Sequence, residues 1–421
     1  MMLRHVGVAV WGVVLGLGVV ETSYGQTPAA ATGSPAAAAP AAGETPAATT
    51  PAATLTSGSP EFDAALKKWD DLRDQLQQAQ VDYKMAKAAD RPPIAEKFNK
   101  LKADGEKLQP EMMKIAEEAL KKNPKSVPIT TFFASFANGY YDADQYEEAL
   151  RLAELLIAAD YSNKRIYNLA GRAAFNLNEF EKAEKYLKIA QENSALDGRA
   201  DGYMQSVAKY KELWKKEQAL RDAESKLTGE KALPRVLLKT TKGDITLELF
   251  EDQAPQTVGN FINLVEKGFY NGLTFHRVIH EYMAQGGDPK GDGFGGPGYE
   301  IFCECYKPEH RNHFRGALSM AHSGKDTAGS QFFLTFLPVG AYDGKDVNPK
   351  NEGTPHTVFG RVVSGFDALT KLQKRQPQSS MHNFGPKTPP APADKILEAK
   401  VLNKRNHPYE PTKTATVKVI Q

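Results

Sequence analysis

Arg277 is the residue of this 421-residue chain best suited to aim several hydrogen bonds at one bound group. Its guanidinium is always charged and carries five N–H donors in a fixed fork. Met283 and Phe333, with Tyr282, can form the walls of a dry apolar pocket, and Gln285 can hold a polypeptide main chain. This combination suits a reaction that needs placed donors around a desolvated group and neither a nucleophile nor a metal.

These residues lie in five motifs between residues 275 and 362. In chain order they are Phe275-His276-Arg277-Val278-Ile279, Met283-Ala284-Gln285-Gly286-Gly287-Asp288, Gly316-Ala317-Leu318-Ser319-Met320-Ala321, Gly329-Ser330-Gln331-Phe332-Phe333 and His356-Thr357-Val358-Phe359-Gly360-Arg361-Val362. Together they resemble the cyclophilin family of peptidyl-prolyl cis–trans isomerases, over about residues 235–405. The resemblance implies a closed antiparallel β-barrel of eight strands with two capping helices, a packed interior and an active groove on the outer face.

The resemblance also carries the family's site onto this chain. It implies catalytic roles for Arg277, Gln285 and His356, and substrate contacts from Tyr282, Met283, Ala321, His322, Gln331, Phe333 and Tyr342. Taken singly, Arg277 could be a surface ion-pair residue, and Met283 and Phe333 could be barrel core.

The chemistry of these residue types agrees with that activity. Amide resonance sets a barrier of about 18–20 kcal/mol to rotation about a prolyl bond. A donor aimed at the prolyl nitrogen lowers it, because the nitrogen lone pair localises as the bond twists. A rate gain of about 10⁵ needs about 7 kcal/mol of differential transition-state binding, which placed hydrogen bonds can supply. No cofactor is required.

Several positions depart from the family pattern. The departures are Tyr282 for phenylalanine, His322 for asparagine, Ser323 for alanine, Ala341 for tryptophan or histidine, and Tyr342 for leucine. They bear on cyclosporin affinity and substrate preference more than on turnover. Two insertions, 346–355 and 376–393, interrupt the pattern, and the first directly precedes His356 and could reshape the groove.

The remaining chain divides by composition. We predict a signal peptide (1–25), a disordered Ala/Pro-rich linker (26–60), an α-helical module (61–233), the cyclophilin-like domain (234–405) and a C-terminal tail (406–421). The apolar run that ends at Val20 is short for a membrane span, so the chain is expected to be exported to the periplasm or secreted. The alternative is an uncleaved N-terminal anchor, which would be the only membrane contact.

The helical module shows an internal repeat. Residues about 130–195 repeat with an offset of 34, which aligns Ala137 with Gly171 and Tyr146 with Phe180. This small/large pattern resembles tetratricopeptide repeats and predicts a docking or dimerisation arm for a protein partner. A plain helical bundle without a peptide groove is the alternative.

Other functions are less favoured. Lys and Arg number 53 against 51 Asp and Glu, so no basic excess favours a nucleic acid partner. The two cysteines, Cys303 and Cys305, rule out a disulfide-stapled scaffold and are too close to bridge easily. A metal site formed with His276, His280, His310 and His313 is conceivable but weakly indicated, so we predict none.

The sequence therefore predicts a prolyl isomerase that assists the folding of exported proteins and takes proline-containing polypeptides as substrates. The rival is a non-catalytic cyclophilin-fold scaffold or chaperone that only binds proline-containing segments.

Overall fold

The computed structural model describes residues 56–343, 354–375 and 392–414. The predicted signal peptide, most of the predicted linker, residues 346–353 of the first insertion, residues 376–391 of the second and residues 415–421 lie outside this described part. The described chain forms two compact units that divide at Phe133. The second unit, from Phe133 onward, contains the later helices as well as the whole sheet. This division does not test the predicted boundary between the helical module and the cyclophilin-like domain, so the predicted domain boundaries stay predictions.

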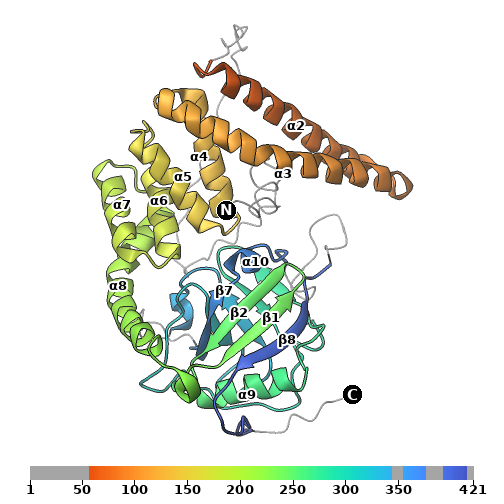
Figure 1. Cartoon of the computed structure of the whole chain (residues 1–421), viewed down its shortest axis with the longest axis vertical. Helices are drawn as coiled ribbons and strands as arrows, with labels where there is room; N and C mark the ends of the chain where they lie inside the picture. The colour runs from red at the N-terminus through yellow and green to blue at the C-terminus, as the bar shows by residue number, and fades with distance from the viewer. Residues whose placement is uncertain (1–55, 344–353, 376–391, 415–421) are drawn as a thin grey trace, which may run out of the picture. The chain divides into compact units, whose positions relative to one another are not determined.

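The first unit is built around a long helical hairpin. Helix α2 (Pro60–Met85) begins after Ser59, whose side chain accepts a hydrogen bond from the Phe62 N–H. Helix α3 (Arg91–Lys122) follows a short 3₁₀ turn, η1 (Ala88–Asp90), and runs alongside α2 (Figure 1). Phe62, Trp69 and Leu76 are buried at seven-residue spacing, so the predicted apolar stripe is a packing seam.

Further helices form successive hairpins. Their bounds are α4 (Val127–Asp142), α5 (Tyr146–Ala158), α6 (Ile166–Asn176), α7 (Phe180–Glu192) and the long α8 (Gly198–Glu224). Tyr146 and Phe180, aligned by the 34-residue offset, each open the second helix of a hairpin and are fully buried. A Cβ on Gly171 would lie 2.7 Å from Leu187, so only glycine permits α6 and α7 to approach this closely.

Eight antiparallel strands follow, as predicted in number. They are β1 (Arg235–Thr240), β2 (Gly243–Leu249), β3 (Arg277–Ile279), β4 (Met283–Gly286), β5 (Ala317–Met320), β6 (Phe332–Thr335), β7 (Val358–Ser364) and β8 (Ile396–Asn403). They form one sheet in the order β3-β4-β6-β5-β7-β2-β1-β8. Register shifts in the β1–β8, β2–β7 and β5–β7 pairs help to curl it. Since β3 and β8 end this order, the sheet is a curled half-barrel, and full closure stays a prediction.

Large aromatic side chains fill the inside of the curl. Helix α9 (Pro255–Glu266) contributes Phe261, whose ring meets Phe332 of β6 and Phe359 of β7 at 5.5 and 5.3 Å. The short α10 (Phe366–Thr370) follows its N-cap Gly365, where φ is +91° and a Cβ would meet the Asp244 carbonyl oxygen at 2.1 Å. Buried side chains fill this interior, which leaves the outer face of the sheet for a binding site.

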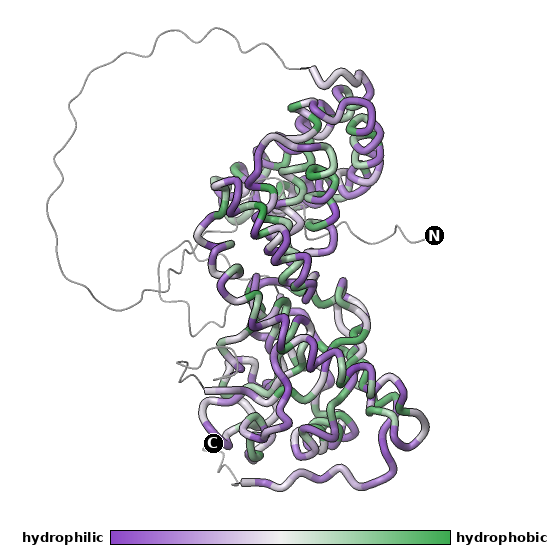
Figure 2. The backbone as a smooth tube through the Cα atoms, turned by 90° about the vertical axis from the view of Figure 1, so that its left-hand side faces the viewer, coloured by the Kyte–Doolittle hydropathy of each residue, from purple (hydrophilic) through white to green (hydrophobic). Residues whose placement is uncertain are grey.

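No helix in the described part of the chain is both long and apolar enough to cross a membrane. Hydrophilic and hydrophobic residues alternate along the helices (Figure 2), as expected for helices with one buried face.

Candidate active site

A chain of polar side chains holds Arg277 on the outer face of the sheet. Arg277 of β3 lies directly opposite Gln285 of β4, with 3.4 Å between Nη1 and Oε1. The Gln285 amide in turn donates to Gln331 Oε1 at 2.9 Å, and Gln331 donates to the carbonyls of Gly293 and Gly295. Within the described residues Arg277 has no carboxylate partner, so most of its N–H donors remain available.

Met283 and Phe333 lie on the same face as Gln285. Strand alternation sends Ala284, Phe332 and Leu334 into the interior core, so Met283, Gln285 and Phe333 point the other way. Met283 and Phe333 are nonetheless only 1% and 3% exposed. These two side chains therefore form an apolar floor beside Arg277 that is separate from the core.

Aromatic rings surround Phe333. Tyr342 and His356 approach it at centroid distances of 5.3 and 5.5 Å, and they contact each other at 4.4 Å. The Tyr282 ring lies 5.7 Å from Tyr342. Burial, together with the hydrogen bond to Tyr342, raises the pKa of the Tyr282 hydroxyl, which is therefore neutral and acts as an amphipathic edge of the site.

His356 forms a neutral rim of this site. Its Nδ1–H donates to the Met320 carbonyl at 2.9 Å, which leaves Nε2 without a partner in the described chain. Burial, with His322 stacked at 4.0 Å, lowers the pKa of His356 to about 3. Burial also lowers the pKa of His322, whose Nε2–H donates to the Pro355 carbonyl at 2.9 Å.

The backbone at Ala321 borders the same site. Its N–H donates to the Gln331 carbonyl at 2.9 Å, so this N–H cannot also bind a ligand. The Ala321 carbonyl and the His322 N–H have no partner within the described residues. All ten residues proposed from the sequence thus lie on β3, β4 and β6 or on the segments that adjoin β4, β5, β6 and β7. Arg277 is linked directly to Gln285 and through it to Gln331.

Comparison with known proteins identifies the family. Residues 235–401 match the model of cyclophilin type peptidyl-prolyl cis-trans isomerases. A peptidyl-prolyl cis-trans isomerase of Helicobacter pylori is 50% identical over 139 residues, 32% of this chain and 78% of that protein. Peptidyl-prolyl cis-trans isomerase B of Bacillus subtilis is 52% identical over 123 residues, 29% of this chain and 78% of that protein. This chain belongs to the cyclophilin family.

The solved structures include a cyclophilin type isomerase of Cryptosporidium parvum, which matches 41% of this chain and 99% of its own at 30% identity and a TM-score of 0.33. The assignment to the family rests on the two bacterial relatives. The predicted enzyme class, peptidyl-prolyl cis-trans isomerase, and the predicted resemblance are thereby confirmed.

Sequence reasoning did not include His313 in this cyclophilin's site. His313 is fully buried and its ring lies parallel to Phe333, at 5.7 Å and 5°. Its Nδ1 lies 2.6 Å from Asp343 Oδ1, and its Nε2 lies 2.8 Å from Ser319 Oγ. No motif marks this residue, because Asp343 and Phe333 reach it only through the fold.

The histidines raised as metal ligands do not converge. No group of three or more His, Cys, Asp or Glu that could hold a metal occurs within the described part of this cyclophilin. Both ring nitrogens of His313 are occupied, and His280 pairs with Asp144. His276 is buried in the β3 segment, and burial lowers its pKa.

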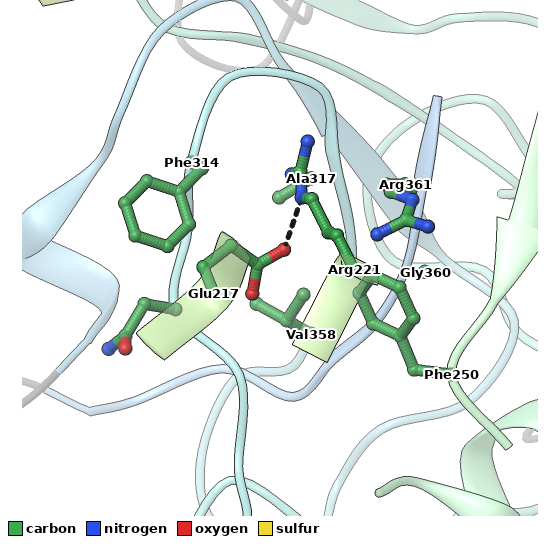
Figure 3. A pocket seen from close by; sticks show the side chains of 9 residues that line it. Glu217, Arg221, Phe250, Phe314, Ala317, Val358, Gly360 and Arg361 are labelled. Carbon is green, nitrogen blue, oxygen red and sulfur yellow. Dashed lines mark hydrogen bonds and ion pairs between the residues drawn. The ribbon is translucent and has the colours of Figure 1, made fainter. Parts of the chain in front are cut away.

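Helix α8 packs on the isomerase sheet through buried charges. Arg311 is 1% exposed and forms a two-pronged ion pair with Glu217 at 2.8 Å and another with Glu224 at 2.5 Å. Burial alone would raise the pKa of Glu217, but Arg311 holds it below its usual value. Figure 3 shows Glu217 and Arg221 pointing toward each other in a small cavity beside Arg361. Since paired charges line this cavity and it lies apart from Arg277, it is a packing void of the junction.

Proposed function

We propose that this cyclophilin isomerises prolyl bonds of exported proteins, with Arg277 aimed at the prolyl nitrogen. The observation that carries the proposal is the position of Arg277, which a chain of two glutamines holds beside the apolar floor of Met283 and Phe333. A proline ring on that floor would leave its nitrogen toward the guanidinium. We take proline-containing polypeptides as the substrates.

The mechanism that we propose needs no covalent step. The proline ring is desolvated against Phe333, which removes competing water from the prolyl amide. As the bond twists, an N–H of Arg277 donates to the nitrogen lone pair, an interaction stronger in the transition state than in the ground state. Gln285 fixes the guanidinium, and the unpartnered carbonyl of Ala321 can hold the substrate main chain.

We also propose that His356 acts without changing its charge. Its low pKa keeps the ring neutral at physiological pH, so Nε2 can accept a hydrogen bond at the rim of the groove. A protonated ring would place a second cation near the guanidinium and compete for the prolyl nitrogen.

The finer features of fold and location belong to the same proposal. We infer that the sheet closes into a barrel, an inference supported by isolated bridges from Thr274 to Lys395 and from Val278 to Arg375 beside its end strand β3. The equivalent burial of Tyr146 and Phe180 supports tetratricopeptide-like hairpins that bind a protein partner. The apolar N-terminal run supports export to the periplasm or beyond the cell, with membrane contact only through that segment if it is not cleaved.

A prolyl isomerisation assay on the full chain tests the proposal. Arg277→Ala should lower kcat/KM by about 10²–10³, the usual cost of removing a transition-state donor. The matched control is Arg73→Ala, which removes a partly exposed arginine of α2 and should leave kcat/KM unchanged. Equal and negligible activity of wild type and Arg277→Ala, with proline-peptide binding retained, would instead establish the non-catalytic scaffold.

A further inference from the structure

The segment 302–306 contains two thiols that the prolyl site does not use. Cys303 is half-buried, and Cys305 is 5% exposed. Between them, Glu304 accepts hydrogen bonds from the N–H groups of Gln256 and Thr257 at the start of α9, at 3.3 and 2.9 Å. The N–H groups of Glu304 and Cys305 both donate to Thr357 Oγ1. These hydrogen bonds fix the backbone of the segment that carries the two sulfurs.

The sulfur of Cys303 faces hydrogen-bond donors. The Asp326 N–H donates to Cys303 Sγ at 3.2 Å, while the Asp326 carboxylate accepts from the Cys303 N–H at 2.8 Å. Asp326 adopts φ of +61°, a conformation that a non-glycine residue rarely takes and that aims its N–H here. The neighbouring Cys305 thiol acts on the same sulfur and is the largest influence that lowers its pKa. These contacts favour a thiolate at Cys303, and the Cys305 hydrogen bond lowers the pKa of Cys303 to about 7.

Cys305 has the opposite character. The hydrogen bond to Cys303, reinforced by burial, raises its pKa, so it remains a thiol and serves as a donor. Its thiol also donates to the Pro355 carbonyl oxygen at 3.3 Å, the same atom that accepts from His322, so its single S–H is shared between Cys303 Sγ and this carbonyl. Two residues apart, the cysteines close a bridge only with difficulty, which favours attack of Cys303 on an outside disulfide over attack on its neighbour.

Exposed apolar side chains flank the thiols. Phe302 is 46% and Tyr306 is 49% exposed, and the Lys325 ammonium lies 5.0 Å from the Tyr306 ring centroid. Two exposed aromatic residues on either side of a nucleophile provide contact area for an unfolded polypeptide. The reach to the prolyl site is short, because His322 shares the Pro355 carbonyl with Cys305 and stacks on His356.

We propose that segment 302–306 is a second active site, at which Cys303 exchanges disulfide bonds of a bound polypeptide. The Cys303 thiolate attacks one sulfur of a substrate disulfide, the substrate S–S bond breaks, and the other substrate sulfur leaves as a thiolate. Another substrate thiolate then attacks the substrate sulfur of this mixed disulfide, forms a new substrate S–S bond and releases the Cys303 thiolate. One S–S bond forms for each one broken, so the cycle needs neither oxidant nor reductant.

Ribonuclease A with scrambled disulfides is the probe, mixed with the reduced full chain without added thiol. Wild type should restore ribonuclease activity at least fivefold faster than buffer alone, and Cys303→Ser should fall to the buffer rate. Cys303→Ser should keep full prolyl isomerase activity, which separates the thiol reaction from prolyl isomerisation of the same probe. Equal recovery by wild type and Cys303→Ser, or no recovery by wild type, overturns the proposal. So does a disulfide-linked dimer of the chain without recovery.

A second measurement tests the proposal on the wild-type chain, so it can be made even if Cys303→Ser folds poorly. Acid quenching of the wild-type reaction should trap a mixed disulfide on Cys303 and none on Cys305. The rate of Cys303 alkylation by iodoacetamide should follow an apparent pKa near 7 in wild type, and Cys305→Ala should move it upward because a donor is lost. Capture on Cys305, or an alkylation profile centred on the ordinary cysteine value of about 8.5, overturns the proposal.

Discussion

Asp144, in the turn between α4 and α5, is fully buried against His280, with 3.0 Å between Oδ1 and Nδ1. The same carboxylate pairs with Lys374 at 2.8 Å and accepts the backbone N–H of Glu281, the residue before Tyr282. These ion pairs and this hydrogen bond therefore link the helical hairpins to the turn between β3 and β4, which leads into the prolyl site.

This pair makes the stability of the junction depend on pH. Burial opposes charging of His280, but Asp144 outweighs it and raises the His280 pKa. The stabilising contribution of His280 is fully present below pH 6.5, its unfolded pKa, and is lost as pH rises through its folded pKa. Burial opposes charging of Asp144 as well, but Lys374 and His280 hold its pKa well below 3.8, so its contribution is lost only in acid.

We expect the melting temperature to fall as pH rises from 6.5 toward 9, and His280→Gln to abolish that fall while leaving the value at pH 9 nearly unchanged. Thermal melts of both proteins at half-unit pH intervals measure it. The control is Asp144→Asn, which should remove the same dependence from the other side of the pair. A wild-type melting temperature that is flat over this range would contradict the assigned charge state of His280.

A second prediction concerns the buried ion pairs of α8. Arg311→Ala leaves Glu217 and Glu224 as buried carboxylates without their main counter-charge, which costs about 3–5 kcal/mol of unfolding free energy. Arg199→Ala, at an exposed pair with Glu281, is the matched control and should cost less than about 1 kcal/mol. Urea unfolding followed by circular dichroism compares them.

A variant with apolar residues in place of the charged ones separates the effect of unpaired charge from the effect of lost packing. Replacing Arg311, Glu217, Glu224 and Arg221 together by methionine removes these charges as well as their pairing, and Arg361 keeps Glu248 as its partner. Much of the lost stability should therefore return. If this quadruple variant is no more stable than Arg311→Ala, packing rather than unpaired charge is responsible for the cost.

The sequence could predict which face of a strand or helix a residue occupies, because that depends only on the spacing of nearby residues. Gln285 and Phe333 take their faces from period-two alternation, and the α2 seam through Phe62 and Trp69 follows from helical spacing. The order of the strands and the register shifts between them depend on tertiary packing, which no local pattern in the sequence records.

Partners far apart in sequence were not predictable in this way. Arg311 lies 94 residues from Glu217, in a helix so rich in charge that each carboxylate appears solvated. His313 lies 30 residues from Asp343, and its contact with Phe333 arises only when β6 packs beside β5. Such contacts are set by tertiary packing, which a single sequence shows only indirectly.

A third prediction tests whether His313 positions Phe333. Asp343→Asn weakens the hydrogen bond that fixes the His313 ring, so kcat/KM for a proline peptide should fall about tenfold while KM changes little. A double-mutant cycle with Phe333→Leu checks the route of the effect. If Asp343 acts through Phe333, the two losses will be strongly non-additive, whereas additive losses would assign Asp343 an independent role.

The last prediction concerns the neutral rim. With a pKa of about 3, His356 should show no titration of its ring proton between pH 8 and 5 in NMR spectra, and it should add no inflection to kcat/KM over that range. Because the folded pKa lies below the unfolded value of 6.5, the unfolded chain binds the extra proton, and His356 costs stability as pH falls from 6.5 toward 3.

His356→Gln can still donate to the Met320 carbonyl and should retain most activity, whereas His356→Ala should lose about tenfold. An inflection near pH 6 that disappears in His356→Gln would mean that the ring is protonated during turnover, and the neutral-acceptor role would then be wrong.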